Sequence, residues 1–348
     1  MQDENLETKE VADGLGEEVL CWVERVTEGT ICAVEPLNAR GPWRLRIDDR
    51  DGKSRALVLR IPVPNWIGAG MIATAAAALQ IAEDHGLSAP RLVASDLDGR
   101  RAGVAALLET ALPGSSAPLP RITDKHLQRA GAAIAKIHAI PLDPSPPELP
   151  LRIRHTQVDD CAAERRWATL YQLCSGRERD EVVDAFCRFS GSSVEGAHET
   201  MSGARLTPLL HLADERIRTM RVPDHESVFL HGDLWWGNML WEGSNCTVVI
   251  DWKTAGVGDP GVDLGDLRMQ MAVWYGPDAA AQVLAGWQQE RGTAASNVPY
   301  WDAVAALNTP AQLTDWPGFD GEGNPLSWQG LTERRDDFLE SALDQLQN

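Results

Sequence analysis

The residue types that could do chemistry gather in one short stretch, which contains Asp233, Asn238 and Asp251. Between Asn238 and Asp251 lie two short apolar runs, at 239–241 and 247–250, and the residues that separate these runs have the composition of a tight turn. The pattern predicts a β-hairpin, with Asp233 in a loop that enters its open end. Carboxylate and amide oxygens would then meet at one place.

The position of the turn decides which of these side chains are neighbours. A turn centred between Ser244 and Asn245 pairs Asn238 with Asp251, whose Cα atoms would lie ~4.5–5.5 Å apart. An amide oxygen beside a carboxylate suits Mg²⁺, which takes one or two carboxylates plus substrate phosphates. The carboxylate of Asp233, left free beside the metal, could accept the proton of a hydroxyl nucleophile. The spacing therefore predicts a candidate site for phosphoryl transfer.

The same stretch carries a family resemblance. The block 229–264 is similar to the signature of the aminoglycoside phosphotransferase and choline kinase-like family. Looser similarities at 57–60, 89–92 and 135–140 extend the resemblance over most of the chain. The motifs that carry it are His231-Gly232-Asp233, Asn238, Ile250-Asp251-Trp252 and the segment 256–264.

The resemblance implies a bilobal protein-kinase-like fold of the α+β class. In that fold an antiparallel sheet with one main helix forms the N-lobe, and a larger, mostly helical C-lobe carries the catalytic β-hairpin. Patterning along the chain agrees, because strand-like runs dominate early and helical periodicity dominates later. The early part predicts strands at 30–34, 43–47 and 55–60, a hairpin turn of Asp and Gly at 48–52, and an alanine-rich helix near 71–83. The expected domains are an N-lobe at 1–110 that covers the nucleotide, a proline-containing linker at 111–120, and a C-lobe at 121–348 with the metal and acceptor sites.

The resemblance also assigns roles to matching positions. Asp233 would be the catalytic base that orients the acceptor hydroxyl, while Asn238 and Asp251 would hold Mg²⁺ on the phosphates of ATP. Arg60 would be the phosphate-binding cation, whereas the sequence pattern by itself also fits a solvated charge at the end of an apolar strand. His231 would order the catalytic loop rather than transfer protons, and Asp263 would organise the same loop. The main chain of three consecutive residues would meet the adenine edge: Glu109, Thr110 and Ala111.

Two positions depart from the family pattern. The helix between Arg60 and Gly86 usually supplies a glutamate to the phosphate-binding cation, but an alanine, Ala75, stands there, and Glu83 lies about two turns further on. The loop 37–42 holds a single glycine where a phosphate-covering loop usually has more, so fewer backbone amides would approach the phosphates. Both departures concern ATP binding rather than the transfer centre.

Composition limits the partners. The 348-residue chain carries 51 Asp and Glu against 32 Lys and Arg, a net charge of −19, which disfavours nucleic acid and anionic membranes and slightly favours a cationic acceptor. No apolar stretch reaches the ~18 residues of a membrane span. The acidic N-terminus does not resemble a secretory signal, and six cysteines without a CxxC pair predict reduced thiols. We expect a cytoplasmic protein.

The leading hypothesis is an ATP- and Mg²⁺-dependent kinase that phosphorylates a hydroxyl of a small molecule, either an antibiotic such as an aminoglycoside or macrolide, or an ordinary metabolite. A nucleotide-binding pseudo-kinase is the alternative, which the two departures favour and the intact Asp233, Asn238 and Asp251 oppose. A metal-dependent hydrolase built on His231, Asp233 and Asp251 would lack the nearby histidines of a usual zinc site. Asp233, Asn238 and Asp251 could also be plain turn and cap residues.

Two further groups of residues leave alternatives open. Trp235 and Trp236 could stack on a sugar or base, or pack between the lobes. Asp159, Asp160 and Glu164 could dock an ammonium-rich substrate, or form the solvated start of a helix, where acidic residues are favoured.

Overall fold

The chain forms two compact units, and each is discontinuous in sequence. The first comprises residues 1–115, 145–149 and 247–255, and the second comprises 116–144, 150–246 and 256–348. The computed structural model describes the residues 15–38, 41–63, 67–142, 145–152, 167–168, 170–190, 193–203, 207–224, 227–314 and 316–346. Ala39 and Arg40 of the predicted phosphate-covering loop, and the acidic residues Asp159, Asp160 and Glu164, lie outside the described residues.

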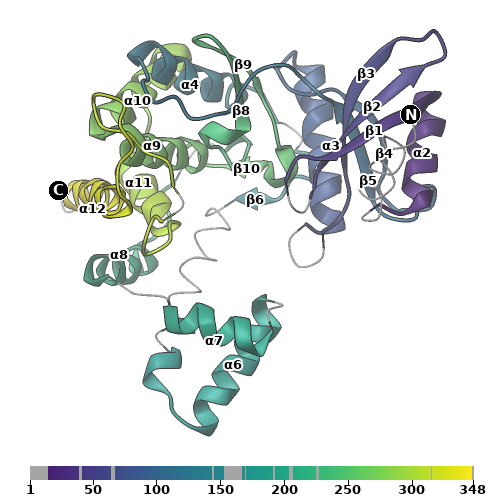
Figure 1. Ribbon diagram of the computed structural model, residues 1–348. Coiled ribbons are helices and arrows are strands. Elements are labelled where there is room, and N and C mark those ends of the chain that lie inside the picture. The colour runs from purple at the N-terminus through teal and green to yellow at the C-terminus, as the bar shows by residue number, and fades with distance from the viewer. Residues whose placement is uncertain are drawn as a thin grey trace. The chain divides into compact units, whose positions relative to one another are not determined.

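The first unit is built on an antiparallel sheet of five strands in the order β1-β2-β3-β5-β4 (Figure 1). The turn predicted between 48 and 52 is confirmed, because β2 ends and β3 begins on either side of a hairpin closed by Asp49 and Lys53. The strands are β1 (Gly29–Pro36), β2 (Trp43–Asp49), β3 (Ser54–Arg60), β4 (Leu92–Asp96) and β5 (Ala106–Thr110).

Side chains alternate between the two faces of this sheet, as the period of a strand requires. Leu57 and Leu59 of β3 join the apolar core with Leu108 of β5, and Trp22 of helix α2 (Glu17–Thr27) packs in the same cluster. The other face receives Arg60, whose partner across the ladder is Leu107. Since residues two apart on a strand share a face, Glu109 lies diagonally beside Arg60.

The described part of this unit contains two α-helices. The alanine-rich helix predicted near 71–83 is present as α3 (Ala69–Asp84), whereas α2 was not predicted. The 3₁₀ helix η3 (Trp252–Thr254) packs on α3, and the hydroxyl of Thr74 donates to the carbonyl of Glu148 at 3.0 Å. Two segments from far along the chain therefore complete the first unit.

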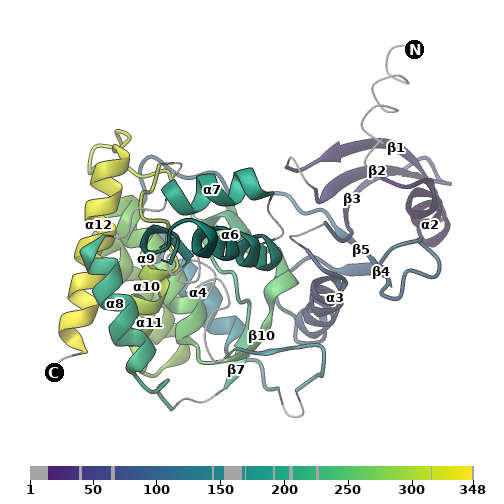
Figure 2. The ribbon, with the colours of Figure 1, turned by 90° about the horizontal axis from the view of Figure 1, so that it is seen from below.

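The second unit is mainly helical (Figure 2). Its three-stranded sheet has the order β6-β10-β7, with β6 (Leu151–Arg152), β10 (Gly256–Gly258) and β7 (Val228–Leu230). The α-helices in its described part are α4 (Asp124–Ile137), α6 (Arg177–Ser190), α7 (Val194–Gly203), α8 (Pro208–Thr219), α9 (Gly261–Tyr275), α10 (Pro277–Arg291), α11 (Val298–Leu307) and α12 (Trp328–Gln345).

Helix α9 is the centre of the second unit, since it contacts α4, α10, α11 and α12 and is buried along nearly its whole length. Helices α4 and α10 approach each other at two glycines. A Cβ atom at Gly131 would lie 2.0 Å from the carbonyl oxygen of Val283, and one at Gly286 would lie 2.0 Å from that of Gln128. Larger residues at either position would push these backbones apart.

The predicted hairpin exists, but its turn lies one residue earlier than predicted. Strands β8 (Met239–Glu242) and β9 (Asn245–Val249) form a two-stranded sheet, and the turn residues are Gly243 and Ser244. Gly243 takes a positive φ of 57°, which glycine adopts without strain. Asn238 and Asp251 lie outside both strands, so the predicted ladder pair between them is wrong.

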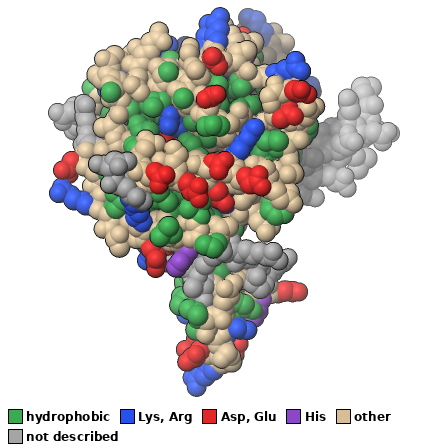
Figure 3. All heavy atoms as spheres, turned by 90° about the vertical axis from the view of Figure 1, so that its left-hand side faces the viewer, with side chains coloured by type: hydrophobic (Ala, Val, Ile, Leu, Met, Phe, Trp, Pro, Cys, Tyr) green, Lys and Arg blue, Asp and Glu red, His purple; other side chains and the backbone are tan. Residues whose placement is uncertain are grey.

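Several acidic side chains lie close together on the face drawn in Figure 3. Within the part of the chain that the structure describes, no helix is both long enough and apolar enough to cross a bilayer. No disulfide joins the five described cysteines.

Candidate active site

The loop that carries Asp233 is fixed by a buried carboxylate. Asp263, at the start of α9, accepts the backbone N–H of His231 on Oδ2 at 2.8 Å and that of Gly232 on Oδ1 at 2.7 Å. Its Oδ2 also lies 3.1 Å from Nε2 of His138. Burial alone would raise the pKa of Asp263, but the bond from His138 and the nearby donors outweigh it and hold the pKa below its ordinary value. Asp263 is therefore an ionised anchor for the loop.

His138 is itself oriented by a tryptophan. The indole N–H of Trp287 on α10 donates to Nδ1 of His138 at 3.1 Å, so Nε2 carries the proton that His138 donates to Asp263. The ring of His138 is completely buried. A chain of contacts thus runs from α10 through the end of α4 to the loop that carries Asp233.

The end of the loop is held by a second set of bonds. The backbone N–H of Trp236 donates to Oε1 of Gln270 at 2.7 Å, and the indole of Trp236 stacks on Trp241 with 4.4 Å between ring centres. The Nδ2 of Asn238 donates to the carbonyl of Asp233 at 2.8 Å, which turns its Oδ1 away from that carbonyl. The structure therefore brings Asp233 and Asn238 together, with an amide oxygen of the type that Mg²⁺ prefers.

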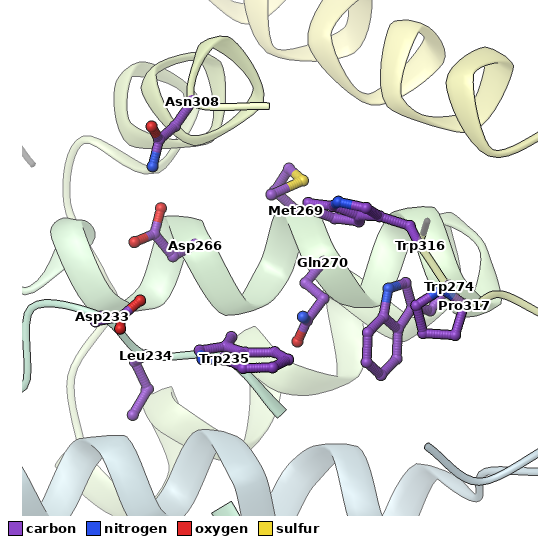
Figure 4. A pocket seen from close by; sticks show the side chains of 10 residues that line it. All are labelled: Asp233, Leu234, Trp235, Asp266, Met269, Gln270, Trp274, Asn308, Trp316 and Pro317. Carbon is purple, nitrogen blue, oxygen red and sulfur yellow. The ribbon is translucent and has the colours of Figure 1, made fainter. Parts of the chain in front are cut away.

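Asp233 lines a cavity of about 350 Å³ in the second unit. Asp233, Asp266 and Asn308 line one end of it, and Trp274, Trp316 and Pro317 line the other (Figure 4). Such a volume falls in the range of small-molecule sites. The remaining lining residues are Leu234, Trp235, Met269 and Gln270.

The first unit holds a separate cluster of charges around Arg60. Its Nε donates to Oε1 of Glu109 at 3.0 Å, and its Nη1 donates to Oδ1 of Asp251 at 2.7 Å. The Nζ of Lys253 lies 2.6 Å from Oδ2 of Asp251. Two cations thus face two carboxylates. Burial opposes the charge on Arg60, but the carboxylates outweigh it and raise the pKa of the guanidinium above its ordinary value.

The glutamate missing from α3 has a substitute in the sheet. Ala75 is buried and has no polar group, whereas the carboxyl of Glu109 from β5 contacts Arg60 directly. Burial raises the pKa of the Glu109 carboxyl, and the attraction of Arg60 offsets part of that rise. Glu109 therefore enters this cluster through its side chain, a role that the sequence did not predict.

Asp251 has an unusual backbone for a residue with a side chain. Its φ of 69° and ψ of 56° are left-handed, which costs about 1–2 kcal/mol outside glycine. The adjacent Trp252 is buried and its indole N–H donates to the carbonyl of Val249 at 3.0 Å. Packing of Trp252 therefore maintains a backbone turn that aims the Asp251 carboxylate at Arg60 and Lys253.

The segment predicted to meet adenine ends β5. The N–H of Thr110 donates to the carbonyl of Arg91 at 3.0 Å, and the N–H of Ala111 donates to that of Ala56 at 3.1 Å. Glu109 pairs with strands on both sides. These backbone donors are engaged, so contact with a base through this segment would use carbonyl oxygens.

The chain matches the phosphotransferase enzyme family over residues 44–307, about three quarters of its length. It belongs to this family. The predicted family, the α+β kinase-like fold and the small-molecule kinase class are thereby confirmed. No curated protein sequence matches the chain.

Solved structures of phosphotransferases show the same fold. An aminoglycoside-3'-phosphotransferase of type VIII is 20% identical with a TM-score of 0.52, and covers 84% of this chain and 100% of its own. A macrolide 2'-phosphotransferase of type I is 18% identical with a TM-score of 0.54, covering 94% and 95%. An AMP-bound spectinomycin phosphotransferase is 13% identical with a TM-score of 0.53, covering 84% and 88%.

Several residues around this phosphotransferase's site were not singled out from sequence. Lys253 follows Asp251 by two residues, and this spacing did not predict their ion pair. Asp266, Gln270 and Trp274 did leave a signal, because with Asp263 they recur every three or four residues and so share one face of α9. Apolar residues on the other faces of α9 obscured that signal in the sequence.

Proposed function

We propose that this phosphotransferase moves the γ-phosphate of ATP to a hydroxyl of a small molecule, with Asp233 as the base. The observation that carries the proposal is the position of Asp233, whose loop is held by Asp263 and Gln270 and whose side chain lines a ligand-sized cavity. An ordinary aspartate is a weak base, but phosphoryl transfer passes through a loose transition state in which positioning dominates. Asp233 would orient the acceptor hydroxyl and take its proton.

Asn238 and Asp251 are the proposed ligands of Mg²⁺. The donor chemistry fits, because Asn238 presents an amide oxygen and Asp251 presents a carboxylate, and both are oxygen ligands of the kind that Mg²⁺ takes. When bound, the metal would neutralise charge on the transferred phosphate. Arg60 uses two of its five N–H donors on carboxylates, so others remain to contact phosphate.

The two units would then bind different substrates. We assign nucleotide binding to the first unit, with carbonyl groups of Glu109, Thr110 and Ala111 at the adenine edge, and acceptor binding to the second. The adenine nucleotide in the similar spectinomycin enzyme supports ATP as the donor. The names of the other similar enzymes, an aminoglycoside and a macrolide phosphotransferase, support an antibiotic acceptor. We assign the protein to the cytoplasm, where ATP is at hand.

Replacing Asp233 tests the proposal. Asp233→Asn keeps the size of the side chain but cannot take a proton, so we expect turnover to fall by about 10²–10⁴-fold while MgATP binding persists. ADP release is measured with aminoglycosides, macrolides and hydroxylated metabolites, and Asp337→Asn on the exposed face of α12 is the control. Unchanged turnover in Asp233→Asn would contradict the role of Asp233. Nucleotide binding without turnover of any acceptor by the unaltered protein would instead favour the pseudo-kinase.

A further inference from the structure

We infer that a groove lined by helices α10 and α12 binds an amphiphilic carboxylate, a molecule with one carboxylate group and an extended apolar body. The groove has a volume of about 410 Å³, which falls in the range of small-molecule sites. Buried residues of α9 and α11 complete its lining, and none of its lining residues belongs to the cavity at Asp233. The inference therefore goes beyond the proposed function and does not depend on it.

The shape and chemistry of the groove fit an extended apolar body. Its lining runs from Pro277 to Gln288 on α10 and from Arg334 to Gln345 on α12, which on each helix is about three turns, or about 16 Å. Most of the surface that the groove exposes is apolar. Leu284 is partly exposed there, and the small side chains of the lining alanines leave room for a ligand. A ligand that covers this surface removes apolar area from water, which stabilises the complex.

One end of the groove offers a cation that has no carboxylate partner. Nη1 of Arg334 donates to the carbonyls of Val273 and Trp274, at 3.2 and 3.0 Å. It also donates to the carbonyl of Phe319 at 3.0 Å. Since α9 ends just before α10 begins at Pro277, the start of α10 and Arg334 mark the same end of the groove. In the described part of the chain, Nε and Nη2 of Arg334 meet no acceptor, and no carboxylate lies within ion-pair distance of them.

The charge of Arg334 is therefore poorly compensated. Burial lowers the pKa of its guanidinium, and the attraction of Asp320 offsets only part of that effect. At Arg60, by contrast, two bound carboxylates raise the pKa above its ordinary value. A carboxylate of a ligand would supply the missing charge at Arg334. It could accept from Nε and Nη2 together, in the paired geometry that guanidinium and carboxylate groups favour.

A second guanidinium supplies further donors in the lining. Arg268 is 9% exposed, and its Nε and Nη2 pair with Asp302 while its Nη1 donates to the carbonyl of Ala280 at 2.7 Å. These bonds use three of its five N–H groups, so among the described residues two remain for an oxygen of the ligand.

The acids of the lining do not oppose a carboxylate strongly. The charge of Asp302 is compensated by Arg268, which leaves Asp337 as the one lining acid without a cation in the described part of the chain. Asp337 is exposed, so water and salt screen its charge, whereas Arg334 is partly buried. The charges of the groove therefore favour a carboxylate over an amine.

Calorimetry with the full chain tests the inference. The probes are decanoate, which has both parts of the expected ligand; acetate, which has the carboxylate without the apolar body; and decyltrimethylammonium, which has the body with the opposite charge. Each is used below its critical micelle concentration, so that monomers rather than aggregates are measured. We expect decanoate to bind about tenfold or more tightly than either of the others. Equal affinities, tighter binding of the cation, or binding of decanoate only above its micelle concentration would overturn the inference.

Variants locate the bound ligand. Ala285→Trp, at an exposed lining position on α10, should fill the groove and lower the affinity for decanoate by about tenfold or more, whereas Gln289→Trp, exposed on the same helix but outside the lining, should leave it unchanged. Arg334→Gln should abolish the preference for decanoate over decyltrimethylammonium. Because Arg334 also holds the end of α9, Ala285→Trp decides the question if Arg334→Gln does not fold. Unchanged decanoate binding in Ala285→Trp would overturn the inference and leave the proposed function standing, since no phosphoryl transfer is measured.

Discussion

Substituting Asp263 by asparagine tests whether this residue anchors the loop that carries Asp233 or only contributes to general stability. Asparagine has one side-chain acceptor where Asp263 uses two oxygens, so at least one of the N–H groups of His231 and Gly232 would face an amide donor. A hydrogen bond to a charged group contributes about 1.5–3 kcal/mol, so losing or weakening two of them should lower the free energy of unfolding by about 3–5 kcal/mol. Displacement of Asp233 by even 1 Å should lower kcat by about 10²-fold.

A matched control lies in the same unit. Asp302 on α11 is also buried and pairs with both Nε and Nη2 of Arg268, at 3.0 and 2.9 Å, whereas Asp263 binds the loop backbone itself. Asp302→Asn should lower the free energy of unfolding by a similar ~3–5 kcal/mol because it leaves a buried guanidinium poorly paired. Its kcat, measured by ADP release below the unfolding transition of both variants, should stay within about twofold of the parent enzyme.

The stability contributed by Asp263 should also depend on pH. Because the folded-state pKa of Asp263 lies below its ordinary value, the stability from its charge is complete above that ordinary value and is lost as the pH falls through the folded pKa. Urea unfolding should therefore show the deficit of Asp263→Asn shrinking as the solution is acidified below about pH 4. Parent-like kcat in Asp263→Asn, or an equal kcat loss in Asp302→Asn, would refute the anchoring argument.

Two further changes have defined outcomes. Asp251→Ala removes a proposed ligand of Mg²⁺, which also contacts Arg60. Nucleotide binding measured by calorimetry should therefore lose its dependence on Mg²⁺, and a retained Mg²⁺ effect would contradict metal binding by Asp251. Gly286→Ala places a Cβ against the carbonyl of Gln128 and should lower the free energy of unfolding by about 1–3 kcal/mol. The control Gly70→Ala, in an open helical position, should raise the free energy of unfolding by up to ~1 kcal/mol. Equal urea midpoints for the two variants would show that α4 and α10 move apart easily.

Local sequence patterns predicted several elements of the fold correctly. Strands β2 and β3 were predicted from alternation and a turn of Asp and Gly, and α3 from its apolar run, because each of these signals lies within about fifteen residues. The turn of the β8–β9 hairpin was predicted one residue too late, at Ser244 and Asn245 instead of Gly243 and Ser244. The preference of Gly243 for positive φ was the signal that could have corrected the position.

Only part of the site could be predicted from the sequence, because some of its contacts depend on how distant segments pack. The roles of Asp233, Asn238 and Asp251 came from a spacing motif, and they remain predictions until tested. The contact of Glu109 with Arg60 depends on β5 lying beside β3, which is a property of strand order across 49 residues and leaves no local pattern. The ion pair of Lys253 with Asp251 likewise depends on the left-handed turn at Asp251.

The discontinuity of the first unit bears on how the protein is made. Its sheet is complete once Ser115 has been synthesised, yet Asp251 and the η3 helix that packs on α3 follow some 140 residues later. At translation rates of about 5–20 residues per second, the sheet would wait roughly 7–28 seconds on the ribosome before its last segment emerges. Until then the face with Arg60 and Glu109 would lack its cover, which makes this nascent intermediate a natural client for chaperones.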